Sequence, residues 1–281
     1  MENKQLTKNM DKINVTYVFK FEQTHDEIAF DNYMQAHWAD SFIYSAVYLI
    51  VIFGTQVYMQ NRKRYELRPY LALWSGLLAV FSIIGSFRTL PEMVWSLKTQ
   101  GFFYSCCNSS FIDQGNVSSF WTALFTLSKV LELGDTVFIV LRKQPLIFLH
   151  WYHHITVLWY CWFSYSEKIA PGRWFMVMNY VVHSFMYSYY CVRALQYQLP
   201  KWVNMFITTL QVIQMIMGIV VNIVAYNALN EGKQCHHNYR NIRFCLIMYF
   251  SYLVLFLHFF YSTYIVKKPS TRGQHDKQKV H

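Results

Sequence analysis

Seven apolar stretches, separated by short polar segments, dominate the sequence. Their residues are 41–60, 70–87, 118–141, 145–166, 173–195, 202–229 and 244–266. Each stretch approaches or exceeds the roughly 20 residues that a helix needs to cross a bilayer. Because unpaired backbone groups are not tolerated in lipid, these segments are expected to be helices rather than strands of an open sheet. The pattern predicts an all-α polytopic membrane protein with seven transmembrane helices.

The composition agrees with a membrane environment. Of the 281 residues, 54% are hydrophobic and only 14% are charged, whereas a soluble domain usually carries about 25% charged residues. The formal net charge of +10 can indicate a nucleic-acid partner. Here, however, the cations lie in the polar connections between apolar stretches, where solvated basic loops are the commoner meaning. We therefore expect membrane lipid, and no nucleic acid, around this chain.

The distribution of Lys and Arg predicts the orientation in the membrane. Most of these residues lie in the connections 61–68, 142–143 and 193–201 and in the tail 267–281. By the positive-inside rule these segments face the cytoplasm, and the N-terminus faces the other side. No signal peptide is expected, because residues 1–36 are polar where a signal peptide needs an apolar core. We expect a lumenal segment 1–36, one membrane domain 37–266 and a cytosolic tail 267–281, with short disordered ends.

The tail and the lumenal segments predict a compartment. Lys277 and Lys279 stand five and three places from the end, as in the cytosolic dilysine signal for return to the endoplasmic reticulum; a merely basic tail is the alternative. Three N-glycosylation sequons fall in predicted lumenal segments, at Asn14, Asn108 and Asn116. A disulfide from Cys106 or Cys107 to Cys235 can form there, because all three cysteines lie in lumenal loops.

The fourth apolar stretch contains a cluster of histidines. His150, His153 and His154 follow one another at i, i+3 and i+4, so a helix places all three imidazoles on one face. Ionisable groups inside a membrane segment are costly and mark working sites. Neutral imidazole can be a metal ligand, a general base or a covalent nucleophile.

Three neighbouring stretches carry polar groups at helical spacing. Opposite charges in the third stretch can neutralise one another and orient a histidine of the next helix, although a purely structural ion network is the alternative. The glutamines of the sixth stretch can donate to an oxyanion or act as helix glue. The residues are Lys129, Glu132, Asp135 and Thr136 in the third stretch, Asn179, His183 and Tyr187 in the fifth, and Gln211 and Gln214 in the sixth.

These residues resemble those of the eukaryotic fatty-acid elongases, the very-long-chain 3-oxoacyl-CoA synthases, over nearly the whole chain. The matching motifs are Lys129-x-x-Glu132-x-x-Asp135-Thr136, His150-x-x-His153-His154, Asn179-x-x-x-His183-x-x-Met186-Tyr187 and Thr208-Thr-Leu-Gln211-x-x-Gln214. The form His150-Trp-Tyr-His153-His154 is similar to the branch that elongates saturated and monounsaturated chains. Arg173, where that branch tends to have glycine, is a departure at the lumenal start of a helix.

The resemblance implies a fold and an activity. Six of the seven helices would form an inverted-repeat barrel around a substrate tunnel, in the endoplasmic reticulum membrane. The activity would be condensation of acyl-CoA with malonyl-CoA through an acyl-imidazole on His153. His183 would orient or activate this nucleophile, and His150 and His154 would position it. The amides of Asn179, Gln211 and Gln214 would stabilise negative charge.

The expected site opens toward the cytoplasm, where both CoA thioesters are found and where loop cations can attract them. Elongases of this type work with a separate 3-oxoacyl-CoA reductase, a dehydratase and an enoyl reductase, so association with these enzymes, and a homodimer, are further expectations. No cofactor is implied for this chain itself.

Two other function classes compete with this interpretation. Di-iron membrane desaturases and hydroxylases also use an H-x-x-H-H sequence, but they need about eight histidine ligands so that each metal has a defined set of ligands. This chain has 11 histidines in all, of which only five lie in the predicted spans, so no metal is expected. A seven-span receptor or lipid-binding protein would explain the topology but not the polar stripes on three helices.

Overall fold

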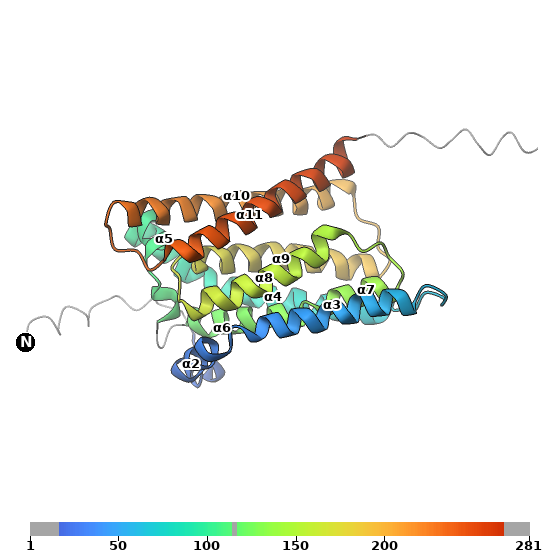
Figure 1. Cartoon of the computed structure of the whole chain (residues 1–281), viewed down its shortest axis with the longest axis horizontal. Coiled ribbons are helices and arrows are strands. Elements are labelled where there is room, and N and C mark those ends of the chain that lie inside the picture. The colour runs from blue at the N-terminus through green and yellow to red at the C-terminus, as the bar shows by residue number, and fades with distance from the viewer. Residues whose placement is uncertain (1–16, 114–116, 267–281) are drawn as a thin grey trace, which may run out of the picture.

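The structure is a computed structural model that describes residues 17–113 and 117–266. Within these residues the regular elements are all helical (Figure 1). The N-terminal elements are α1 (Lys20–Gln23), α2 (Glu27–His37), α3 (Asp40–Tyr58), α4 (Arg68–Trp95), η3 (Ser96–Gln100), α5 (Gly101–Cys107) and η4 (Ser110–Ile112). The others are α6 (Val117–Leu131), α7 (Gly134–Leu141), α8 (Phe148–Ser166), α9 (Gly172–Ala194), α10 (Lys201–Asn230), α11 (Tyr239–Phe260) and η5 (Tyr261–Ile265).

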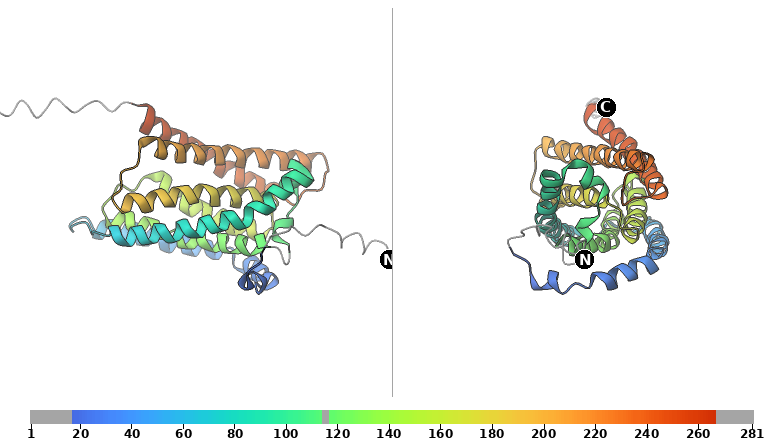
Figure 2. Two further views of the ribbon diagram at one scale, coloured as in Figure 1. Left: turned by 180° about the vertical axis from the view of Figure 1, so that it is seen from behind. Right: turned by 90° about the vertical axis from the view of Figure 1, so that its left-hand side faces the viewer.

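Each predicted apolar stretch lies on a long helix, or on the α6–α7 pair, and these helices run along the long axis of the molecule (Figures 1 and 2). Four helical segments of the described chain are long and apolar enough to cross a membrane: Asp40–Tyr58, Arg68–Cys107, Lys201–Asn230 and Tyr239–Ile265. The chain is therefore built as a multi-pass membrane protein. The helices α6–α7, α8 and α9 are not among these four segments. They carry polar residues at helical spacing, and these residues lower their mean hydropathy. The count of seven spans and the six-helix inverted-repeat barrel stay predictions.

The outer and inner faces of the bundle differ in the way that a lipid environment requires. Ile50, Phe87 and Ile247 are each at least 70% exposed, and exposed apolar side chains of this kind suit contact with acyl chains. Small polar residues lie inside, where they let helices approach closely. The buried hydroxyls of Ser86 and Thr89 donate to the carbonyl four residues earlier in α4. Helix–helix contact in the bundle therefore relies on close packing and internal hydrogen bonds.

Helix α6 ends in a tight turn that positions two carboxylates. The amide of Asp135 donates to the carbonyl of Glu132 at 3.1 Å, and α7 begins at Gly134. A side chain at Gly134 would overlap the indole of Trp74 on α4. Glycine at this position lets α4 lie directly against the turn, and both carboxylates then point into the bundle from adjacent positions.

The described part of the N-terminal segment is largely helical and contacts the bundle. Helix α2 runs across one end of the bundle rather than along it (Figure 2). Ahead of it, the Glu22 carboxylate is buried and accepts from Arg88 Nη2 at 2.6 Å and from Trp121 Nε1 at 2.7 Å. The sequence around Glu22 did not indicate that its side chain is buried, because its hydrogen-bond partners lie 66 and 99 residues away along the chain.

A disulfide joins Cys107, at the end of α5, to Cys235 in the α10–α11 connection. Cys106, the other candidate, is a free buried thiol. Among the sequons, Asn14 and Asn116 lie outside the described residues, as does the dilysine tail. Asn108 follows α5, and its side-chain oxygen accepts from the Ser110 amide. Its glycosylation stays a prediction.

The Glu22 contacts predict a pH-dependent docking of the N-terminal segment. Burial raises the pKa of this carboxyl, but hydrogen bonds from Arg88, Trp121 and the Phe19 amide outweigh burial and hold the pKa below its ordinary value of 4.5. The carboxylate therefore stabilises docking above about pH 4.5, and this stabilisation is lost as the pH falls through the lower folded-state pKa.

We expect Glu22→Gln to lower the stability of the protein by about 1–3 kcal/mol at pH 7 and by progressively less as the pH falls below 4.5. Thermal unfolding in detergent across this pH range measures the difference. Glu66→Gln removes an exposed carboxylate that pairs with Arg64 and is the matched control. A difference that stays constant across the pH range would contradict the account.

Candidate active site

A polar cavity of about 170 Å³ lies between α8, α9, α10, α11 and the α6–α7 turn. Its wall contains all but one of the catalytic and binding residues predicted from the sequence: Glu132, Asp135, His150, His153, His154, Asn179, His183, Tyr187, Gln211 and Gln214. The exception is Lys129, which lies behind Glu132 and Asn179 and contacts both. Three helices (α8, α9 and α10) and the α6–α7 turn thus bring their polar side chains to one place, and α11 closes the cavity with Phe256 and Phe259.

The three histidines of α8 share one wall of this cavity. The rings of His150 and His154 are 4.6 Å apart between centroids, and those of His153 and His154 are 5.7 Å apart. His150 Nε2 lies 3.0 Å from Thr136 Oγ1, which in turn lies 2.7 Å from the hydroxyl of Tyr48 on α3. This chain of hydrogen bonds fixes the ring of His150 from two other helices.

Lys129 and Glu132 form a buried ion pair at the base of the site. Lys129 Nζ donates to Glu132 Oε1 at 2.7 Å and to Asn179 Oδ1 at 2.8 Å, and it lies 4.2 Å from the centre of the Phe125 ring. Ser128 Oγ also donates to Glu132 Oε1. Lys129 is 2% exposed and Glu132 is 4% exposed. Charges this deep are tolerated because each has a partner of opposite sign and further hydrogen bonds.

The ion pair determines which nitrogen of His183 carries the proton. Lysine only donates hydrogen bonds, so the atom of Asn179 that faces Lys129 must be the amide oxygen. The amide nitrogen of Asn179 then donates to His183 Nε2 at 3.1 Å. In the neutral ring the proton therefore lies on Nδ1, which is 3.8 Å from Glu132 Oε1. His183 is thus oriented and polarised, with its Nε2 occupied.

Asp135 is held by two donors from other helices. Trp74 Nε1 on α4 donates to Oδ1 at 2.6 Å, and the Tyr187 hydroxyl on α9 donates to Oδ2 at 2.8 Å. Because Tyr187 donates its proton to Asp135, its oxygen presents lone pairs toward the cavity. The carboxylate therefore fixes the direction of the Tyr187 hydroxyl bond.

His153 lies where two cavities meet. The second cavity, of about 70 Å³, is mostly apolar and extends along α8 away from the polar one. His153, Asn179, Gln214 and Met215 line both cavities. Within the described residues, no side chain or backbone group hydrogen-bonds a ring nitrogen of His153, whose ring instead lies 5.0 Å from that of Tyr252. This imidazole is available to react with a group at the junction.

The two glutamines of α10 differ in their surroundings. Gln211 Nε2 approaches Met186 Sδ at 3.5 Å, a weak contact to α9. The Gln214 side chain is buried, yet it lines both cavities beside His153. The structure therefore places an amide donor at the junction. It shows little of the hydrogen bonding between helices that would be expected if the two glutamines only held helices together.

Sequence reasoning missed three aromatic residues of the site: Tyr48, Trp74 and Tyr252. Tyr48 contacts Thr136, Trp74 contacts Asp135, and the Tyr252 hydroxyl contacts Thr156 and the carbonyl of His153. The chain has 22 tyrosines and 9 tryptophans, so nothing in their spacing distinguished these three. The hydroxyl of a buried tyrosine and the indole N–H of a buried tryptophan need hydrogen-bond partners. Which residue is the partner depends on how the helices pack, and the sequence does not show this.

The described residues offer no obvious metal site, since no group of three or more His, Cys, Asp or Glu side chains among them is arranged to hold a metal ion. The desaturase alternative gains no support from this arrangement.

Comparisons with known proteins agree on the family. Residues 33–272 match the sequence profile of the GNS1/SUR4 family. The chain is 51% identical over 254 residues to very long chain fatty acid elongase 6 of Drosophila melanogaster, covering 90% of this chain and 80% of that protein. It is 49% identical to the Mus musculus protein of the same name, covering 91% and 96%, and 50% identical to the Homo sapiens one, covering 90% and 95%. This chain therefore belongs to the GNS1/SUR4 family of fatty acid elongases.

Proposed function

We propose that this chain condenses a long-chain acyl-CoA with malonyl-CoA, giving a 3-oxoacyl-CoA two carbons longer together with CoA and CO2. The family membership supports this reaction. The single observation that carries it is the position of His153, at the junction of a polar cavity and an apolar one. A thioester in the polar cavity with its acyl chain in the apolar cavity would present its carbonyl carbon to this imidazole.

In the first half of the reaction, a ring nitrogen of His153 attacks the thioester carbonyl. The carbon–sulfur bond breaks, and the departing thiolate takes the proton that the imidazole loses, so CoA leaves and the acyl group stays on His153. Negative charge develops on the carbonyl oxygen during this step. The Gln214 amide and the second amide hydrogen of Asn179 are donors on residues that line both cavities, and such donors typically contribute a few kcal/mol.

In the second half, malonyl-CoA loses CO2, and the electron pair of the broken carbon–carbon bond forms an enolate. The enolate carbon attacks the acyl carbonyl, the bond to His153 breaks, and the departing imidazolate takes a proton from water, which restores neutral His153. This balance needs no redox cofactor. His183 is suited to position the reacting groups, because its Nε2 accepts from Asn179 while its Nδ1 proton faces Glu132.

The arrangement of the ends supports the orientation proposed from the sequence. The basic connections after α3 and α7 lie at one end, and the disulfide lies at the other (Figure 1). Arg62, Lys63, Arg64, Arg142 and Lys143 line one surface at the basic end. We propose that this end is cytosolic, that the disulfide end is lumenal, and that the membrane is that of the endoplasmic reticulum. Saturated and monounsaturated long-chain acyl-CoAs are the proposed substrates.

Incubation of the purified protein with palmitoyl-CoA and malonyl-CoA labelled with carbon-13 at its methylene carbon tests the activity. We expect a 3-oxoacyl-CoA two carbons longer that carries one labelled carbon, detected by mass spectrometry. No labelled product with any acyl-CoA from 12 to 20 carbons long, from protein that is folded by thermal unfolding, would overturn the proposed reaction.

The nucleophile assignment predicts a defect in the first half-reaction alone. With acyl-CoA and no malonyl-CoA, we expect the unaltered protein to release close to one CoA per molecule, and His153→Ala to slow this release by roughly 10³-fold or more, because loss of a nucleophile removes the covalent route. His258→Ala, which alters an exposed histidine of α11, is the control. Undiminished CoA release from folded His153→Ala would disprove this role.

The buried ion pair predicts a separation of stability from activity. Lys129→Met leaves Glu132 buried without its counter-charge and is expected to lower stability by about 3–5 kcal/mol. Adding Glu132→Leu removes the unpaired charge and restores much of that loss. The activity of the double variant stays low, because nothing then fixes the Asn179 amide and the proton of His183. Unfolding curves and initial rates for both variants measure the two effects, and recovery of activity along with stability would count against the orienting role.

A further inference from the structure

The apolar cavity has a defined far end. His153 and Tyr165 both line it, and they are separated on α8 by 12 residues, or about 18 Å of helix. At the level of Tyr165 the wall is formed by Phe111 and Ile112 of η4 together with Ile169 and Gly172. Phe111 is completely buried. A chain that entered from His153 would therefore meet this wall with its methyl end.

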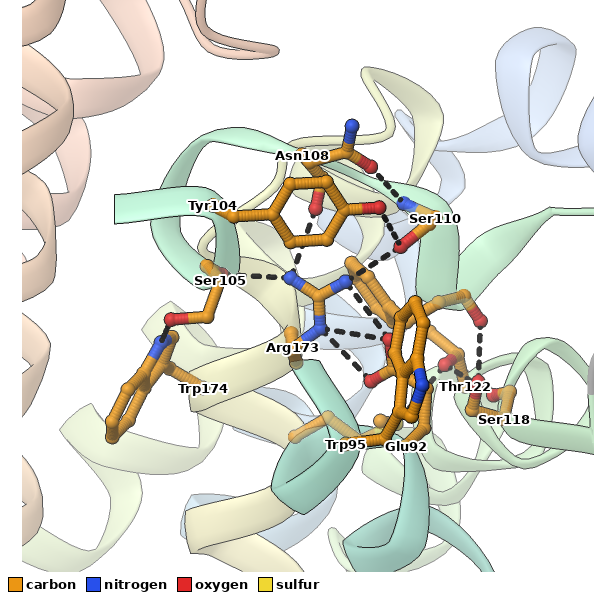
Figure 3. A network of polar contacts seen from close by, with 12 residues as sticks. Glu92, Trp95, Tyr104, Ser105, Asn108, Ser110, Ser118, Thr122, Arg173 and Trp174 are labelled. Atoms are coloured by element: carbon orange, nitrogen blue, oxygen red, sulfur yellow. Dashed lines mark hydrogen bonds and ion pairs between the residues drawn. The ribbon is translucent and has the colours of Figure 1, made fainter. Parts of the chain in front are cut away.

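The guanidinium of Arg173, which is 0% exposed, lies next to this wall and is surrounded by hydrogen-bond acceptors (Figure 3). Its Nε and Nη2 donate to the two oxygens of Glu92, each at 2.9 Å. Its Nη1 donates to the carbonyls of Ser105 and Asn108 at 2.8 and 2.9 Å, and Nη2 also donates to Ser110 Oγ at 2.9 Å. All five N–H groups of the side chain have acceptors.

The position of Arg173 requires its partner. A cation in the first turn of α9 faces the positive end of the helix dipole, which is unfavourable. Glu92 on α4 offsets this charge. The remaining donors hold the segment from Ser105 to Ser110, so one side chain ties α4, α5, η4 and α9 together at the closed end.

Phe111 separates this ion pair from the cavity. The guanidinium carbon of Arg173 lies 5.1 Å from the centre of the Phe111 ring. A methyl group added at Gly172 would come within 3.2 Å of Phe111 Cζ, so the edge of the ring lies close to the start of α9. The Phe111 carbonyl accepts from Ser118 Oγ at 2.7 Å. Hydrogen bonds thus fix the segment that carries the ring, because Arg173 binds Asn108 and Ser110 while Ser118 binds the Phe111 carbonyl.

We propose that Phe111, held in place by the Arg173–Glu92 pair, sets the upper limit of acyl chain length. This inference rests on the proposed condensing function. A chain one methylene too long must either displace a ring that several hydrogen-bonded segments hold or expose its end to a buried ion pair. Both are costly, so the limit is sharp. Phe111 is the specificity-determining residue, and Arg173 and Glu92 position it.

Two variants with opposite effects test the proposal. Phe111→Ala enlarges the far end, so its longest product should be at least two carbons longer than that of the unaltered protein. Gly172→Ala pushes against the ring and should shorten the longest product by two carbons. Relative to lauroyl-CoA, kcat/KM for the longest acyl-CoA that the unaltered protein accepts should rise in the first variant and fall in the second, each by at least ~10-fold.

The matched control is Phe163→Ala, which removes a buried phenylalanine that does not line the cavity and should leave the longest product unchanged. The double variant Glu92→Met with Arg173→Met removes both charges behind the ring, and its longest product should also lengthen. Because each readout compares chain lengths within one variant, a general loss of stability does not imitate it.

The outcomes separate the two proposals. If the unaltered protein makes no 3-oxoacyl-CoA from any chain, the condensing function fails. If it does, but Phe111→Ala and Gly172→Ala both keep its longest product, or both shift that product in the same direction, then Phe111 is not the limit and the inference fails. Should Phe111→Ala not fold, the smaller change Phe111→Leu decides, because loss of the ring must still lengthen the longest product if Phe111 is the limit.

Discussion

The buried ion pair between Lys129 and Glu132 is the interaction on which the arrangement of the active site depends. Two charges inside an apolar bundle are stable only together, so they fix the end of α6 and the turn that follows it. Lysine then determines which way the Asn179 amide faces, and that amide determines which nitrogen of His183 is protonated. The ion pair therefore determines, through Asn179, that the proton of the neutral His183 ring lies on Nδ1.

A second buried ion pair, Arg173 with Glu92, lies at the opposite end of the molecule. Hydrophobic burial does not hold helices together in lipid, because acyl chains are as apolar as leucine. Specific polar contacts must supply part of the adhesion, and the structure places ion pairs where several helices meet. Arg173 and Glu92 pair beside Phe111, which lines the apolar cavity, and Arg88 and Glu22 dock the N-terminal segment. Between His153 and Phe111, the apolar cavity leaves space in the interior of the bundle.

The sequence predicted well those features that depend on local spacing. The apolar stretches predicted the helices, and the spacing of His150, His153 and His154 predicted one shared face. It predicted poorly the contacts that join distant segments. Nothing local links Glu22 to Trp121, Trp74 to Asp135 or Arg173 to Glu92, since each pairing depends on how helices pack. Hydropathy alone also fails to identify α8 and α9 as membrane spans. The polar residues that form the site lower the mean hydropathy of these two helices.

The central claim is that His153 carries the acyl group between the two halves of the reaction, and locating that group tests it most directly. The protein would be incubated with palmitoyl-CoA alone, quenched rapidly at low temperature and digested, and its peptides mapped by mass spectrometry. The account predicts a palmitoyl group on the peptide containing His153, fragmentation that places it on that residue, and its disappearance on addition of malonyl-CoA. An acyl group that is found on another residue and is consumed by malonyl-CoA would contradict it.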